Sequence, residues 1–230
     1  MKVATYGERR VVEYDESRWK LLKEKRKVAR EIMETLEDFG IPSILYGSVA
    51  RGDVKESSDV DIFVPLQVPS FKLELALSDY EILEKRIIQA TPNHVVKGEF
   101  VLSNANVSFP LAKMKDRELD FYKFGGSINL EELKEGKRVC GVDKRLVLIV
   151  PESFGHVEIP INELDKSEVA KILGVGIDIV EERIRVLERR REIGRTGVFL
   201  KEKVADFDSF EKFLEKISER NQLVRRRVKL

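Results

Sequence analysis

The chain has 230 residues, of which 42% are hydrophobic and 36% charged, and its formal net charge is +1. This length suits one large domain or two small ones, and the apolar fraction is enough for a hydrophobic core. The single cysteine, Cys140, excludes an internal disulfide and fits a reducing compartment. Because no apolar run reaches the roughly 18 residues of a membrane span and the first residues lack an apolar signal stretch, we expect a cytoplasmic protein without a membrane partner.

The spacing of apolar residues predicts mixed helices and strands in the N-terminal half. A spacing near 3.6 indicates an amphipathic helix, and alternation indicates a strand. Gly125-Gly126 ends this pattern. The expected elements are a short strand or an extended arm at 3–14, a helix at 17–39, strands at 43–46 and 62–64, a helix at 73–88, and strands at 95–102, 106–111 and 118–124.

The C-terminal half changes character twice. Residues 137–161 are rich in strand formers, whereas the chain from 167 onward has helical spacing almost to its end, with a break at 194–197. We therefore expect an α+β chain in three parts. These parts are residues 1–126, a β-rich connecting segment at 127–164 and a helical region at 165–230 with a basic tail.

Two acids stand one residue apart at the start of an apolar strand. In a strand, Asp59 and Asp61 project from the same face, where their carboxylates repel each other. A cation between them removes this repulsion, and oxygen ligands suit Mg²⁺ (or Mn²⁺), which keeps waters and binds substrate phosphates. Two such ions about 3.5–4 Å apart would stabilise the attacking and leaving oxygens of a nucleotidyl transfer.

The turn before these acids has the features of a phosphate site. Gly47 permits a tight turn, and Ser48 opens a short helix whose free N–H groups favour phosphate. Arg51 adds a cation for a triphosphate oxygen or for an acidic neighbour. A P-loop is excluded, because Asp53-Val54 follows the second glycine where Lys and Ser or Thr are required. The spacing of a calcium loop is absent too.

Together the two stretches resemble a known signature. YGSVARG at residues 46–52, followed by SDVDIF at 58–63, resembles the signature of the DNA polymerase beta-type nucleotidyltransferase superfamily, and its small prokaryotic members in particular. The resemblance covers residues 17–125 and implies a domain with a mixed sheet and helices. It implies that NMP passes from an NTP such as ATP to a hydroxyl acceptor, with release of pyrophosphate. The implied nucleotide-binding residues are Gly47, Ser48 and Arg51, and the implied ligands of two Mg²⁺ ions include Asp59 and Asp61.

The family also carries a third carboxylate on a later strand, where it acts as general base. The resemblance places this acid at Asp120, 59 positions after Asp61 and in an expected strand, as catalytic residue and metal ligand. Glu118 lies on the same face and is the alternative. If Asp120 has no catalytic role, we expect it to form a surface ion pair with Lys115 or Arg117.

The region at 167–190 resembles a winged helix-turn-helix module. Ala170, Gly174 and Val180 stand at the offsets of a helix crossing, a turn and a β-branched anchor. Two packed helices without nucleic acid are the alternative, and Glu181-Glu182 favour it. The second helix would present four arginines to RNA or DNA. They are Arg183, Arg185, Arg189 and Arg190.

The charge distribution leaves a second function open. Residues 183–230 hold 15 Lys and Arg against 8 Asp and Glu, as expected of a segment that meets a polyanion. The alternative to an enzyme is therefore a nucleic-acid-binding regulator whose N-terminal domain only senses nucleotide. The acceptor, the preferred NTP and the oligomeric state, a homodimer included, stay open.

Overall fold

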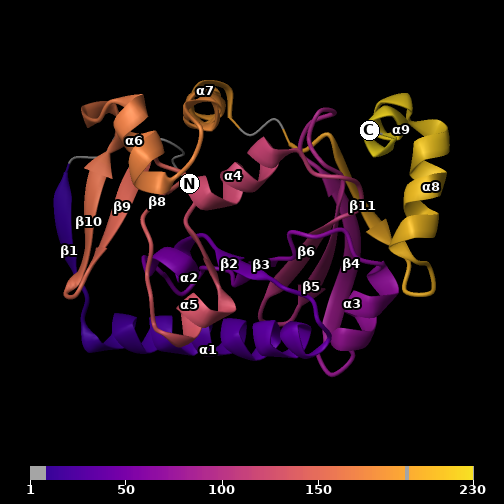
Figure 1. Ribbon diagram of the computed structural model, residues 1–230, viewed down its shortest axis with the longest axis horizontal. Helices are drawn as coiled ribbons and strands as arrows, with labels where there is room; N and C mark the ends of the chain where they lie inside the picture. The colour runs from indigo at the N-terminus through magenta and orange to yellow at the C-terminus, as the bar shows by residue number, and fades with distance from the viewer. Residues whose placement is uncertain (1–8, 195–196, 230) are drawn as a thin grey trace. The chain divides into compact units, whose positions relative to one another are not determined.

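The computed structural model describes residues 9–194 and 197–229 (Figure 1). It divides into two compact units. Unit 1 takes the described parts of residues 1–27, 45–58 and 119–196, and unit 2 takes those of 28–44, 59–118 and 197–230. Among the described helices, none is long and apolar enough to cross a membrane. The elements that contribute residues to both units are α1 (Glu16–Asp38), β2 (Ile44–Tyr46) and α4 (Asp116–Phe124).

Unit 1 is built on a four-stranded antiparallel sheet (Figure 1). The strand order is β1 (Arg10–Glu13), β10 (Gly155–Pro160), β9 (Val147–Glu152) and β8 (Gly141–Val142). The other elements of this unit are α2 (Ser48–Arg51), β7 (Ser127–Asn129), α5 (Leu130–Lys134), the 3-10 turn η1 (Ile161–Glu163), α6 (Lys166–Leu173) and α7 (Ile177–Ile193).

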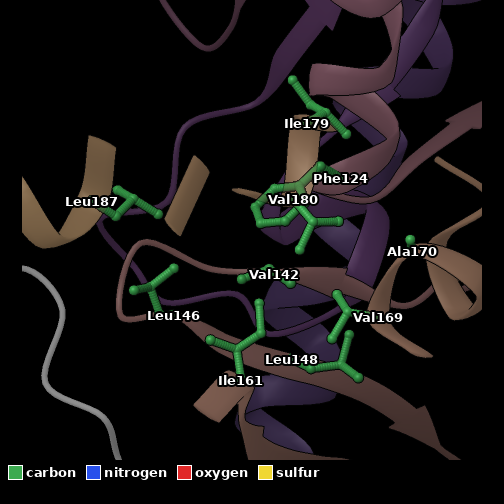
Figure 2. Packing of buried hydrophobic residues seen from close by; sticks show 10 residues of the cluster. All are labelled: Phe124, Val142, Leu146, Leu148, Ile161, Val169, Ala170, Ile179, Val180 and Leu187. Carbon is green, nitrogen blue, oxygen red and sulfur yellow. The ribbon is translucent and has the colours of Figure 1, made fainter. Parts of the chain in front are cut away.

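The strands and helices of unit 1 share one hydrophobic cluster, shown in Figure 2. Val142 and Leu148 contribute from β8 and β9, and Val169 and Val180 contribute from α6 and α7. Gly174 ends α6 with φ of 62°, a left-handed conformation that glycine adopts without strain. The two helices therefore pack onto the strand-rich segment across a glycine turn. Their assignment as a helix-turn-helix module stays a prediction, as do the boundaries at 126 and 164.

Unit 2 holds five paired strands. Their order is β11 (Leu200–Val204), β4 (Ile82–Gln89), β5 (Lys97–Leu102), β6 (Asn106–Pro110) and β3 (Asp61–Phe63). The pairing of β3 with β6 is parallel, and the other three pairings are antiparallel. The helices of this unit are α3 (Ser70–Ala76), α8 (Phe210–Arg220) and α9 (Gln222–Val228).

Three aromatic rings fill the centre of unit 2. Phe100 and Phe109 lie on neighbouring strands with ring centroids 5.7 Å apart, and Phe210 of α8 meets them at 5.0 and 5.1 Å. All three side chains are fully buried. Gly98 belongs to this packing, because a Cβ atom there would lie 2.5 Å from Cζ of Phe109. Any larger residue at position 98 would displace the rings.

The α+β class and most expected elements are confirmed, but the helix predicted at 73–88 is wrong. Helix α3 ends at Ala76, and strand β4 begins at Ile82. Burial along β4 alternates with the period of two that a strand requires. Strands pair with β4 on both sides, and this pairing overrides the helix-like spacing of its apolar residues.

Two further expectations about elements are wrong. Residues 118–124 form part of helix α4, because the Glu118 carboxylate accepts a hydrogen bond from Lys115 N at 2.8 Å and so satisfies a free N–H at the helix start. The C-terminal region is not helical throughout, because β11 pairs with β4. The strand expected at 3–14 is observed at Arg10–Glu13, and its residues up to 8 lie outside the described part.

Candidate active site

The turn of the motif follows strand β2 in unit 1. Gly47 has φ of 82° and ψ of −147°, and its N–H donates to Gly126 O at 2.9 Å. Helix α2 is a single turn in which Arg51 N donates to Gly47 O at 3.0 Å. A Cβ atom at position 47 would meet no described heavy atom within 4 Å. The backbone of this turn is therefore open to close approach by a ligand.

Arg51 closes the turn rather than facing outward. Its side chain is buried, and its Nε and Nη2 atoms donate to the two carboxylate oxygens of Asp53, each at 2.9 Å. Its Nη1 atom donates to Gly125 O at 2.5 Å. Of the two partners expected from the sequence, the acidic neighbour is the one observed. These contacts support a structural role, and nucleotide binding by Arg51 stays a prediction.

The glycine pair at 125–126 makes room for this arginine. Gly126 has φ of 82°, and a Cβ atom there would lie 2.7 Å from Cγ of Arg51. A Cβ at Gly141 would lie 2.6 Å from Gly125 O. The pair therefore serves as a close-packed support for α2 in addition to ending an element. In the sequence, the double glycine was the only indication of this packing. The spacing of residues does not show that Arg51 is its contact partner.

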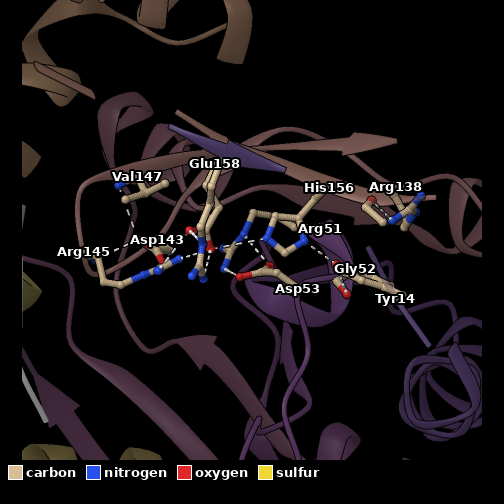
Figure 3. Close-up of polar contacts among 12 residues, drawn as sticks. Tyr14, Arg51, Gly52, Asp53, Arg138, Asp143, Arg145, Val147, His156 and Glu158 are labelled. Atoms are coloured by element: carbon tan, nitrogen blue, oxygen red, sulfur yellow. Dashed lines mark hydrogen bonds and ion pairs between the residues drawn. The ribbon is translucent and has the colours of Figure 1, made fainter. Parts of the chain in front are cut away.

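A buried polar network holds the other end of α2 (Figure 3). The Tyr14 hydroxyl donates to Gly52 O at 2.9 Å and lies 2.6 Å from Nδ1 of His156. Burial raises the pKa of Tyr14 to about 12. Gly52 has φ of 104°, and a Cβ there would lie 2.6 Å from Cδ of Arg138. Gly47 and Gly52, the two glycines of the motif, both have positive φ angles, and Gly52 also has no room for a Cβ atom.

The same network ends at a buried carboxylate on β10. Glu158 accepts hydrogen bonds from Arg10 at 2.7 Å and from Arg145 at 2.5 Å, and His156 Nε2 lies 3.4 Å from it. Burial alone would raise the pKa of Glu158, but the hydrogen bonds from His156, Arg145 and Arg10 outweigh burial and hold it well below its usual value. Neither this network nor His156 was expected to have a role.

The paired acids of the motif lie in unit 2. Asp59 is exposed two residues before β3, and Asp61 is the half-buried first residue of that strand. Asn106 of β6 stands opposite Asp61 in the parallel pairing, and its Nδ2 atom donates to Asp61 Oδ1 at 3.3 Å. Asn106 was not predicted as a site residue. The one feature of the sequence that could have indicated Asn106 was its position at the start of the expected strand at 106–111.

Lys97 of β5 lies in the electrostatic field of Asp61. Burial lowers the pKa of Lys97, whereas the charges of Glu99, Asp61 and Glu118 raise it. Its Nζ atom lies 5.9 Å from the centroid of the Phe63 ring, two residues along β3 from Asp61. Asp61 is thus one of the charges that favour the protonated form of Lys97.

The contacts of Glu118 argue against a ligand role. Its buried carboxylate accepts hydrogen bonds from Val95 N at 2.6 Å, from Lys115 N at 2.8 Å and from Arg227 Nη2 at 2.8 Å. Both carboxylate oxygens are engaged by these protein donors. Arg227, part of the expected basic tail, is itself buried by this ion pair.

Asp120 lies on helix α4 instead of the predicted strand. Its Oδ2 atom accepts a hydrogen bond from Gly176 N at 3.2 Å, and its Oδ1 atom lies 3.9 Å from Lys123 Nζ. Gly176 is the N-cap of α7, so a carboxylate there satisfies a free N–H and lies at the positive end of the helix dipole. The catalytic and metal-binding role of Asp120 stays a prediction.

The four arginines of α7 have different surroundings. Arg185 and Arg189 are exposed, whereas Arg183 and Arg190 are half-buried. The Arg183 guanidinium lies 4.9 Å from the centroid of the Phe121 ring, and burial lowers its pKa to about 10. Arg183 therefore packs within unit 1, and two of the four predicted nucleic-acid contacts are available on the surface of α7.

Among the residues that the structure describes, no group of three or more His, Cys, Asp or Glu side chains could hold a metal ion. Of the three metal ligands expected from the sequence, Asp59 and Asp61 belong to unit 2 and Asp120 to unit 1, and their role as ligands stays a prediction.

Comparison with protein families finds one that matches the N-terminal half. Residues 13–123 match the family described as "Nucleotidyltransferase domain". Over these residues the chain is similar to a nucleotidyltransferase domain.

A search of curated proteins finds no match. Among solved structures, the chain of "Structure of Cid1 in complex with its short product ApU" is similar over 48% of this chain, with 13% sequence identity and a TM-score of 0.32. The match spans 35% of the length of that chain.

Replacing Arg51 by Met should destabilise unit 1 strongly. The substitution leaves the Asp53 carboxylate buried without its cation, which costs about 3–5 kcal/mol of unfolding free energy. Urea denaturation measures this change. Arg30→Met is the control, because it breaks the exposed Arg30–Glu34 pair and should cost at most about 1 kcal/mol. Equal losses in both variants would contradict an anchoring role for Arg51.

Glu158 should make stability depend on acid pH. Its pKa is lower in the folded protein than in the unfolded chain, where it is about 4.3, so its stabilisation is present above about pH 5 and is lost as the pH falls further. In Glu158→Gln, the free energy of unfolding should decrease less between about pH 6 and pH 3, as read from denaturant titrations. The exposed-site control Glu163→Gln should keep the parent's slope. A parental slope in Glu158→Gln would refute this assignment.

Asp120→Ala should cost about 1 kcal/mol of unfolding free energy, because the N–H of Gly176 loses its acceptor at the start of α7. Asp120→Asn should cost less, since its amide oxygen still accepts this hydrogen bond. Thermal and denaturant unfolding of both variants checks the difference. Identical stability of parent and Ala variant would exclude the capping role, and loss of nucleotidyl transfer in the stable Asn variant would support the predicted catalytic one.

Proposed function

We propose that the protein transfers NMP from an NTP to a hydroxyl acceptor, with release of pyrophosphate, in a reaction that depends on Mg²⁺ or Mn²⁺. The observation that carries this proposal is the pair Asp59 and Asp61 at the start of β3, within the nucleotidyltransferase domain at 13–123. Asp59 is exposed and Asp61 is half-buried, and carboxylate oxygens are ligands that suit a divalent cation.

The residues present fit a bound divalent ion. Mg²⁺ is usually held by one or two carboxylates, several waters and substrate phosphates, and Asp59 and Asp61 supply that number of carboxylates. When bound, the ion would offset negative charge on the triphosphate as pyrophosphate leaves. Asp61 is oriented for this task, because Asn106 donates to one of its oxygens and thereby restricts its rotation.

The turn at Gly47 supports phosphate binding. Its backbone is open on the side where a Cβ would stand, so a phosphate oxygen could approach the N–H groups that begin α2. We propose Gly47 and Ser48 as the residues that bind phosphate. The contacts of Arg51 with Asp53 and Gly125 hold this turn in shape, so that its donors need no reorganisation when the nucleotide binds.

The exposed Arg185 and Arg189 on α7 support a nucleic-acid acceptor. A label-transfer assay identifies the acceptor class without prior choice. The full chain is incubated with each α-labelled NTP, Mg²⁺ and a cell lysate, and the RNA, DNA, protein and small-molecule fractions are separated. Label confined to the RNA or DNA fraction would support a nucleic-acid acceptor. Label in the protein or small-molecule fraction would show that the acceptor belongs to that class instead.

Asp59→Asn and Asp61→Asn should each reduce label transfer by about 100-fold or more, because the cation loses a charged ligand where charge develops in the reaction. Both variants should keep the parent's unfolding temperature. Asp79→Asn is the matched control, an identical change at an exposed turn residue, and should transfer label at the parent's rate.

Parental rates in both motif variants would contradict the proposed function. Transfer by none of the proteins, together with salt-dependent binding of RNA or DNA by the parent, would favour the nucleotide-sensing regulator instead.

A further inference from the structure

Helix α9 of unit 2 separates its exposed cations from its buried side chains. Val224 and Arg227 are buried, and residues three apart lie on the same side of a helix. Arg225 and Lys229 are four apart and lie together on another side, where both are exposed. Arg226 is exposed as well. Helix α9 therefore packs through Val224 and Arg227 and presents three cations to solvent.

The buried Arg227 fixes α9 against the segment that leads into α4. Its Nη2 atom donates to Glu118 Oε2 at 2.8 Å and to Lys113 O at 3.0 Å. Both partners lie in unit 2, as α9 does. The Glu118 carboxylate also accepts from Lys115 N at 2.8 Å. Removing one partner of a buried ion pair would leave the other charge buried alone, so this pair holds α9 and residues 113–118 together.

The charge of these two segments is strongly unbalanced. Residues 113–118 and 225–229 hold seven Lys and Arg against two Asp and Glu, a net charge of +5. Five of the cations are exposed and form no ion pair with any residue that the structure describes. We call these five residues the α9 surface. They are Lys113, Lys115, Arg225, Arg226 and Lys229.

The neighbouring helix α8 shows a different use of cations. Lys216 lies 2.7 Å from Asp208, and Arg220 pairs with Glu202, so the charges of both are matched within the fold. The α9 surface instead gathers like charges. The dipole of α9 favours cations in its last turn, but residues 113 and 115 come just before α4, where the helix dipole disfavours them. A bound anion would relieve this repulsion.

The arrangement favours a nucleic acid over other anionic partners. A helix that binds a membrane exposes an apolar face, whereas Val224 is buried and Val228 half-buried, which leaves Leu223 as the exposed apolar residue of α9. Guanidinium groups match phosphate oxygens with paired hydrogen bonds. A polynucleotide repeats its phosphates along the strand, so one strand can meet cations that are spread over two segments.

We propose that the α9 surface binds the phosphate backbone of a nucleic-acid strand. The contact is one of charge, so it holds the strand without reading its sequence. It differs from the α7 arginines predicted from the sequence, which belong to unit 1. Its use in catalysis rests on the proposed function, in which the strand is the acceptor, whereas the binding itself does not.

The salt dependence of binding tests the proposal. Labelled single-stranded RNA, and DNA of the same sequence, are titrated with the full chain without NTP, and fluorescence anisotropy is read at several KCl concentrations. Arg225→Gln with Arg226→Gln should lower the slope of log K against log salt by about 1.4, because each lost phosphate contact on a single strand contributes about 0.7. Lys113→Gln with Lys115→Gln should lower it equally, with RNA and with DNA.

Lys20→Gln with Lys23→Gln is the matched control, because it removes two exposed cations from α1. This variant should keep the parent's slope. All three double variants replace exposed side chains and should keep the parent's unfolding temperature, which thermal unfolding checks.

An unchanged slope in either double variant of the α9 surface, or an equal fall in the control, would overturn the proposal. So would a parent that binds neither strand at low salt, or one that binds polyglutamate as tightly as RNA, which would indicate an acidic protein as the partner. None of these results bears on nucleotidyl transfer. The expected slopes in a protein without transfer activity would support the α9 surface and overturn the proposed function.

Discussion

The buried pair of Arg51 and Asp53 is the interaction on which the motif turn depends. A guanidinium taken out of water must be matched by acceptors, and here two carboxylate oxygens and the carbonyl of Gly125 supply them. That geometry requires small residues where the Arg51 side chain passes, which accounts for Gly126. It also ties the single turn of α2 to a segment more than 70 residues away in the chain. A helix of four residues has little stability of its own, so its shape is set by these anchors.

A second constraint acts in unit 2, where strand register determines the surroundings of the paired acids. Buried apolar residues on one face of β3 and β6 hold the strands in place, and the opposite face then brings Asn106 to Asp61. The result is an acid oriented by an amide donor and influenced by a nearby lysine.

Residues chosen for chemistry from the sequence divide into two groups. Asp59 and Asp61 have the exposure expected of ligands, and Gly47 has the open, left-handed turn expected of it. Arg51 and Arg183 instead meet partners inside unit 1, although both looked available for anions. The sequence alone does not indicate whether an arginine will pair with a bound ligand or with a neighbouring side chain.

The sequence by itself determined what is local: the α+β class, the glycine turn, the spacing of the two acids at and just before β3, and most elements up to residue 69. These follow from backbone sterics and side-chain period, which act over a few residues. Only the tertiary structure decided that residues 82–89 pair as a strand, that Asp120 lies at the start of α7, and that Asn106 stands beside Asp61. Each of these depends on a partner distant in the chain, and contacts of that kind leave no periodic trace in a single sequence.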